Sequence, residues 1–123
     1  MKRIISVLFL ILSGCSSVQM NGETRIRIEN ISSILNNCSS LIGKTVTVKA
    51  EYKGWDCPSG CKNPGITRSD SCIVDKTGCI YLMGTGKLNP IIDKNKIFLF
   101  RAEVETTKDG TCYLKVVKSN EVR

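Results

Sequence analysis

The sequence of 123 residues contains no histidine, so it lacks the side chain that most often serves as a general base, a nucleophile's partner or a metal ligand. It also has no glycine-rich phosphate-binding loop, and no pair of acidic residues is spaced for general acid–base work. We therefore expect a protein that is not an enzyme and that uses no cofactor.

The sequence also lacks an apolar run long enough to cross a membrane permanently. The longest run, over residues 4–12, is shorter than the roughly 20 residues that a membrane-spanning helix needs. Lys2 and Arg3 precede it, and Ser13 and Gly14 separate it from Cys15. A basic start, a short apolar run and small residues are typical of a signal peptide, which we predict over residues 1–14.

The end of this segment, Leu12-Ser13-Gly14-Cys15, resembles the lipobox of bacterial lipoproteins. The resemblance implies that Cys15 carries a lipid, becomes the first residue after cleavage and anchors the protein to a membrane without crossing it. Ser16 and Ser17 follow with no aspartate after them, which resembles lipoproteins sent to the outer membrane. We expect a lipid-anchored protein of the cell envelope, on the outer membrane and facing the periplasm if the organism has two membranes.

After cleavage, residues 15–30 are expected to form the lipidated N-terminus and a tether, and residues 31–123 one small domain. Loss of Lys2 and Arg3 lowers the formal net charge from +7 to about +5. A basic surface can attract anionic lipid headgroups or polymers, but net charge mainly affects solubility and nonspecific association.

The hydrophobic pattern changes its period once. Between residues 31 and 42 apolar residues recur at helical spacing, with Asn30 placed to cap the helix and Gly43 to end it. From residue 44 apolar and polar residues alternate, which predicts strands. The expected strands are 44–52, 68–74, 79–83, 97–105 and 112–117, with tight turns at Asp75–Gly78 and Lys108–Gly110.

Five strands in the order strand, loop, hairpin, loop, hairpin match an OB-fold, a mainly β Greek-key barrel. Four sequence segments resemble those of a group of prokaryotic OB-fold domains: Leu41–Val48, Gly54-Trp55, Thr67–Asp70 and Asp75–Tyr81. The usual OB helix between the third and fourth strands is nearly absent from residues 84–95. We therefore expect the helix at 31–37 to fill the bottom of the barrel.

Six cysteines remain after Cys15, and an even number in a small exported domain favours three disulfides. The OB topology favours the pairs Cys38–Cys112, Cys57–Cys61 and Cys72–Cys79. A zinc site using Cys57, Cys61, Cys72 and Cys79 is an alternative, although the spacing matches no paired C-x-x-C motif. A redox-active pair of Cys57 and Cys61 is a further alternative.

OB barrels commonly bind ligands along the face of the second and third strands and between two flanking loops. Here that surface would draw on Trp55, Arg68, Asp70, Tyr81 and Lys108. Each also has a structural interpretation: Trp55 as a cap on the barrel's open end, Arg68 in a local ion pair, Tyr81 as cover for a half-exposed face. Nucleic acid is not the expected ligand, because Tyr81 is the only aromatic residue on those two strands.

The sequence therefore predicts a noncatalytic, lipid-anchored envelope protein that acts as a binding or interaction module for an envelope protein or glycan. One alternative is a structural or stress-protective envelope protein without a ligand. Another is a thiol–disulfide or zinc-binding protein that uses the Cys57/Cys61 loop.

Overall fold

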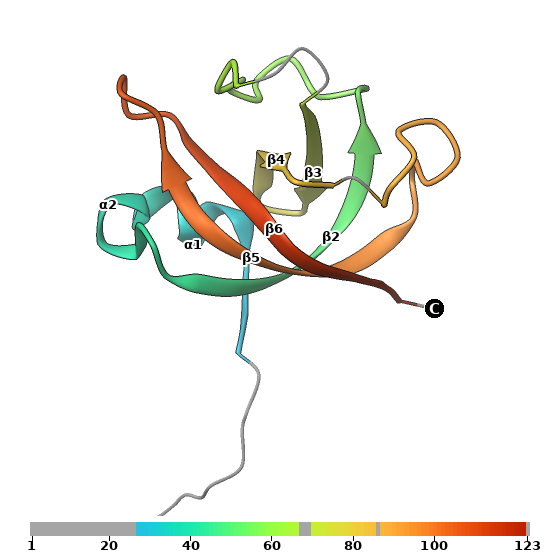
Figure 1. Ribbon diagram of the computed structural model, residues 1–123, viewed down its shortest axis with the longest axis horizontal. Helices are drawn as coiled ribbons and strands as arrows, with labels where there is room; N and C mark the ends of the chain where they lie inside the picture. The colour runs from blue at the N-terminus through green and yellow to red at the C-terminus, as the bar shows by residue number, and fades with distance from the viewer. Residues whose placement is uncertain (1–26, 67–69, 86, 123) are drawn as a thin grey trace, which may run out of the picture.

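The computed structural model describes residues 27–66, 70–85 and 87–122, and the predicted signal peptide and Cys15 lie outside these ranges. Within them, no helix has the length and apolar character needed to cross a bilayer. Figure 1 shows how the elements are arranged. In chain order they are β1 (Ile28–Glu29), α1 (Ile31–Asn36), α2 (Cys38–Leu41), β2 (Thr45–Gly54), β3 (Ser71–Asp75), β4 (Gly78–Met83), β5 (Ile97–Thr106) and β6 (Cys112–Glu121).

The strands form one sheet that closes on itself. Hydrogen bonding orders them β1-β2-β3-β4-β6-β5, and β2 also pairs with β5. That antiparallel pairing runs from Thr45 opposite Glu103 to Glu51 opposite Ile97, and a short parallel pairing of β4 with β6 at Leu82 and Leu114 completes the ring. The predicted five-stranded OB-type barrel is confirmed, with the two-residue β1 added beside β2.

The alternation that predicted the strands also builds the core. Along β2 and β5 every second residue points inward and is buried, while the residues between them are exposed or half-buried. The inward set on these two strands is Val46, Val48, Ala50, Tyr52, Phe98, Phe100, Ala102 and Val104. Phe98 packs at an angle against both Tyr52 and Phe100, so three aromatic rings are in contact within the core.

The helical region closes one end of this barrel, as the sequence predicts. Ile31 and Ile34 are fully buried and belong to the core cluster. The Asn30 side chain accepts the Ser33 N–H at 2.8 Å and caps α1. The expected single helix is instead two short ones, because the Asn37 side chain donates to the Ser33 carbonyl and Asn37 leaves helical geometry.

The turn between β3 and β4 attaches this helix to the barrel. One carboxylate oxygen of Asp75 accepts the Thr77 and Gly78 N–H groups, and the other accepts the Ile31 N–H at 2.9 Å. Burial raises the pKa of Asp75, but the hydrogen bonds from Thr77, Ile31 and Gly78 outweigh it and hold that pKa below its ordinary value. The predicted turn role of Asp75 and Gly78 is therefore confirmed.

Candidate binding groove

The segment after β2 is tied across the outer face of the β3–β4 hairpin. We call residues 55–66 the strap. Its two cysteines form disulfides with one cysteine on each strand: Cys57 with Cys72 on β3, and Cys61 with Cys79 on β4, at Cα separations of 6.0 and 5.6 Å. In Figure 1 the strap runs along the top of the molecule, above β3 and β4.

The third disulfide joins Cys38 at the start of α2 to Cys112 at the start of β6, as expected. The other two expected pairs, Cys57–Cys61 and Cys72–Cys79, are wrong. In the hairpin register Cys72 lies opposite Tyr81 and Cys79 opposite Val74, so the two strand cysteines are diagonal neighbours. Diagonal Cα atoms are about 7–8 Å apart, beyond the usual reach of a disulfide, and each sulfur bonds to the strap above it instead.

This pairing favours the disulfide interpretation of the cysteines over the two alternatives. All four sulfurs of the alternative zinc set are committed to two disulfides, so none is a thiolate that could coordinate metal. Cys57 and Cys61 belong to different disulfides and do not form a redox pair with each other. The four cysteines instead fix the strap on the hairpin.

The strap leaves an open groove beside the hairpin. Its larger part has a volume of about 650 Å³ and its smaller part about 320 Å³, and the two share Leu35, Gly60 and Cys79. The larger part lies between the strap and the β3–β4 turn, over Val74. The smaller part continues past Lys62 to the loop between β5 and β6, where Gly110 and Thr111 line it.

Lysine side chains border the groove along its length, with Lys53 and Lys76 beside the larger part and Lys62 beside the smaller. The Lys53 ammonium lies 3.4 Å from a Glu51 carboxylate oxygen and 3.0 Å from the Asn95 side-chain oxygen. At the other end, hydrogen bonds from Thr107 and Thr111, with a smaller contribution from the charge of Lys62, hold the pKa of Asp109 below its ordinary value. The groove therefore has an apolar floor and polar, mostly basic edges.

Of the five surface residues predicted from the sequence, the four that the structure describes do not line the groove. Tyr81 is only 9% exposed on the outer side of the hairpin and does not line the groove. Trp55 and Lys108 are exposed, but neither lines the groove. Asp70 accepts the Ile66 N–H at 3.0 Å and closes the end of the strap. Arg68 lies outside the described residues.

The groove residues that sequence reasoning missed come from segments that lie far apart in the sequence. Leu35 is on α1, Gly60 is in the strap, Lys76 is in the β3–β4 turn and Thr111 precedes β6. Leu35 carries the one usable signal, because it belongs to the apolar pattern of the helix and is nevertheless 40% exposed. The others have no periodicity that would mark them.

Solved structures with the same fold confirm the topology. The chain superposes on the hypothetical protein YgiW from E. coli with a TM-score of 0.55 and 14% identity, over 78% of this chain and 90% of that one. It superposes on the second OB-fold domain of replication protein A from Methanococcus maripaludis with a TM-score of 0.50 and 14% identity, over 79% and 96% of the two chains. Identities this low show likeness of fold alone.

No protein-family model matches the sequence, and no curated protein matches it. The strand topology and these structural neighbours show that the domain is an OB-fold. Its six described cysteines form three disulfides. OB-folds commonly act as binding modules.

Proposed function

We propose that this protein is a noncatalytic envelope lipoprotein, anchored through a lipid on Cys15, whose OB domain binds a ligand in the groove beside the strap. The observation that carries the proposal is the groove itself. It lies between the loop that follows β2 and the loop that joins β5 to β6, the two loops that flank ligands in OB barrels. Two disulfides fix one of its walls in place before any ligand arrives.

The proposed location is supported by the sequence and by the disulfides. Residues 1–14 have the layout of a signal peptide, and the four residues ending at Cys15 resemble a lipobox. Disulfides persist in oxidising compartments and are rare in the cytosol. Three disulfides in one small domain agree with export to the envelope.

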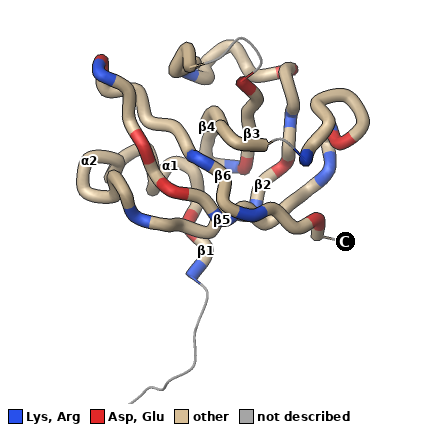
Figure 2. The backbone as a smooth tube through the Cα atoms, in the orientation of Figure 1, with Lys and Arg blue, Asp and Glu red and all other residues tan. Residues whose placement is uncertain are grey.

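The proposed ligand is an extended envelope molecule, either a peptide segment of a partner protein or a glycan. The groove is open along its length and its polar edges carry Lys53, Lys62 and Lys76, whereas its floor is apolar. Figure 2 shows basic and acidic segments interspersed around the barrel, rather than the single basic stripe that tracks a nucleic-acid backbone. Nucleic acid is therefore not the proposed ligand.

The groove is tested by filling it. A Cβ on Gly60 meets no heavy atom within 4 Å, so the strap backbone has room for a side chain, and Gly60→Trp adds an indole at a residue that lines both parts of the groove. We expect this variant to lose at least about tenfold in affinity for soluble cell-wall glycan fragments or for extended peptides, measured by calorimetry. The matched control is Thr45→Trp, which adds the same side chain to an exposed position on β2 outside the groove.

If the unmodified domain binds neither class, the groove proposal fails and the ligand-free structural role becomes the better explanation. Equal loss of affinity in both tryptophan variants would also contradict it.

The lipid anchor is tested separately. Cys15→Ser should abolish incorporation of labelled fatty acid and shift the exported protein from the membrane to the soluble fraction. Retention of label in that variant would contradict the anchor and leave the groove proposal untouched.

A further inference from the structure

A second surface, formed by two neighbouring loops, exposes large apolar side chains. We call Trp55, Ile91 and Ile92 the apolar tip. They are 56%, 74% and 69% exposed, although isoleucine is among the residues most often buried. The two loops approach each other at the residues before and after Trp55. Before it, the Gly54 backbone lies so close to the Pro90 carbonyl oxygen that a Cβ on Gly54 would overlap that oxygen. After it, Asp56 pairs with Lys94 at 2.9 Å.

The loop that presents the two isoleucines is held rigidly. The Asn89 side-chain oxygen accepts the N–H groups of both Ile91 and Ile92, at 2.8 and 2.9 Å. Asp93 accepts the Asn89 N–H at 2.8 Å and pairs with Lys96 at 3.2 Å. Two adjacent isoleucines are therefore held in solvent by a fixed backbone.

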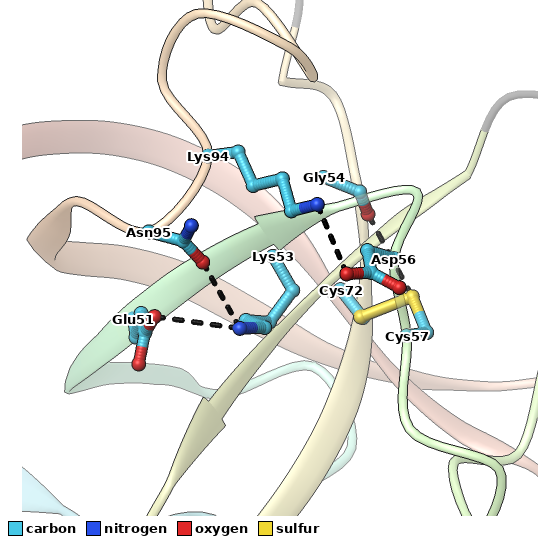
Figure 3. Close-up of polar contacts among 8 residues, drawn as sticks. All are labelled: Glu51, Lys53, Gly54, Asp56, Cys57, Cys72, Lys94 and Asn95. Atoms are coloured by element: carbon cyan, nitrogen blue, oxygen red, sulfur yellow. Dashed lines mark hydrogen bonds and ion pairs between the residues drawn. A yellow bond between two sulfur atoms is a disulfide. The ribbon is translucent and has the colours of Figure 1, made fainter.

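Figure 3 shows how the same loop is fixed to the end of β2. Lys53 donates to the Asn95 side-chain oxygen, and Lys94 reaches across to Asp56. Asn95 takes a positive φ of 72°, and its N–H donates to the Tyr52 carbonyl at 2.7 Å. Because these contacts hold the loop with its isoleucines outward, the fold itself keeps the two side chains exposed.

The charges around the tip favour an anionic partner. The two segments that form it, residues 53–56 and 87–96, contain four lysines and two aspartates, a formal net charge of +2. Lys94 and Lys96 are paired with the two aspartates, so the excess positive charge comes from Lys53, which also lies near Glu51, and from Lys87. Apolar side chains with tryptophan among them, surrounded by lysine, are the composition of surfaces that insert into the headgroup region of anionic membranes.

The chain before the described domain allows such contact. Twelve residue steps separate Cys15 from Arg27, which span up to about 40 Å when extended, more than the roughly 30 Å diameter of a small domain. A lipid on Cys15 would therefore keep every face of the domain within reach of the bilayer. This step rests on the proposed lipid anchor, whereas the tip itself does not.

We propose that the apolar tip docks on the surface of a membrane that contains anionic phospholipid, and so orients the domain on the bilayer. With Trp55 and the isoleucines in the headgroup region, the barrel would be held at a fixed tilt. Apart from Lys53, the residues that line the groove lie outside the two tip segments, so the groove would remain open to the periplasm.

The test uses the mature chain with Cys15→Ser, exported and oxidised, so that binding cannot come from the lipid. The probe is a vesicle of phosphatidylethanolamine and phosphatidylglycerol. Trp55 is the only tryptophan, so its emission reports on the tip alone. We expect a blue shift on vesicle addition, quenching by brominated lipid, and weaker binding to phosphatidylcholine vesicles.

The decisive variant is Ile91→Ser with Ile92→Ser, whose backbone hydrogen bonds to Asn89 do not depend on the side chains. It should lower vesicle partitioning by at least about tenfold, since it removes most of the apolar area available for insertion. The matched control, Val117→Ser, changes an equally exposed apolar residue on β6 and should leave partitioning within about twofold. Unchanged unfolding midpoints would show that both variants remain folded.

Three results would overturn the proposal: no partitioning of the unmodified protein, equal loss in the Val117→Ser control, or self-association that the double variant abolishes. The last would assign the tip to a second copy of this chain. Gly60→Trp should not affect partitioning measured by co-sedimentation with the vesicles, a readout that does not depend on tryptophan emission, so failure of the tip and failure of the groove are distinguishable.

Discussion

The strap and the 89–95 loop both follow a strand of the barrel, and they are fixed by opposite means. Two disulfides hold the strap, and apart from them it makes few hydrogen bonds of its own among the described residues. The 89–95 loop contains no cysteine and is held by Asn89, Asp93 and Lys94. Covalent fixation requires only two residues to be placed correctly, whereas fixation by hydrogen bonds requires nearly every residue of the loop to contribute.

Removing a strap disulfide should give the largest effect. We expect Cys57→Ala with Cys72→Ala to lower the free energy of unfolding by about 3 kcal/mol, because the cross-link closes a 15-residue separation in the unfolded chain. Urea unfolding measures the loss. Amide exchange at residues 91 and 92 should stay unchanged, because their N–H groups bond to Asn89 and not to the strap. Faster exchange at these two amides would mean that the two loops are not independent.

The next effect concerns the backbone where the two loops meet. Gly54 has a φ of +59°, and a Cβ there would lie 2.3 Å from the Pro90 carbonyl oxygen. Gly54→Ala should therefore cost about 2 kcal/mol or more, since both strain and overlap must be relieved. Gly60→Ala in the strap, where a Cβ meets nothing, is the control and should change stability by less than about 0.5 kcal/mol. Equal effects at the two glycines would refute the close approach.

A smaller effect is expected from the loop's own cap. Asn89→Ala removes the acceptor of the Ile91 and Ile92 N–H groups and should cost about 1 kcal/mol. Amide exchange measured by NMR should quicken at residues 91 and 92 but not in the strap. Unchanged protection at those two amides would show that the side chain of Asn89 does not hold the loop.

The smallest effect is a dependence on pH. The Asn89 N–H and the Lys96 ammonium hold the pKa of Asp93 below its ordinary value of 3.8. A lowered pKa in the folded state means that Asp93 contributes stability above pH 3.8 and loses it as the pH falls further. Local opening of the 89–95 loop should therefore increase in acid, an increase that Asp93→Asn should reduce. The hydrogen bond from Lys94 also holds the pKa of Asp56 below its ordinary value, so the comparison uses the strap from Cys57 onward. That part is held by disulfides and should show no such trend; parallel opening there and in the 89–95 loop would contradict this contrast.

Local sequence signals predicted most of the barrel. The alternation in β2 and β5, the cap at Asn30 and the turn at Asp75 each depend on residues within a few positions of one another. The predicted strand at 68–74 begins only at Ser71, and β6 continues to Glu121 rather than 117. Strand ends are set by pairing partners, such as β5 opposite the end of β6, which the sequence of one strand does not contain.

The sequence by itself determined the barrel, the helix that fills its end and the commitment of six cysteines to disulfides, because periodicity, turn chemistry and an even cysteine count are properties of the chain. Only the tertiary structure decided the two pairings of the strap cysteines, the burial of Tyr81, the groove and the apolar tip. Each of these depends on the path of an aperiodic loop across a surface, and that path is set by contacts between residues far apart in the sequence.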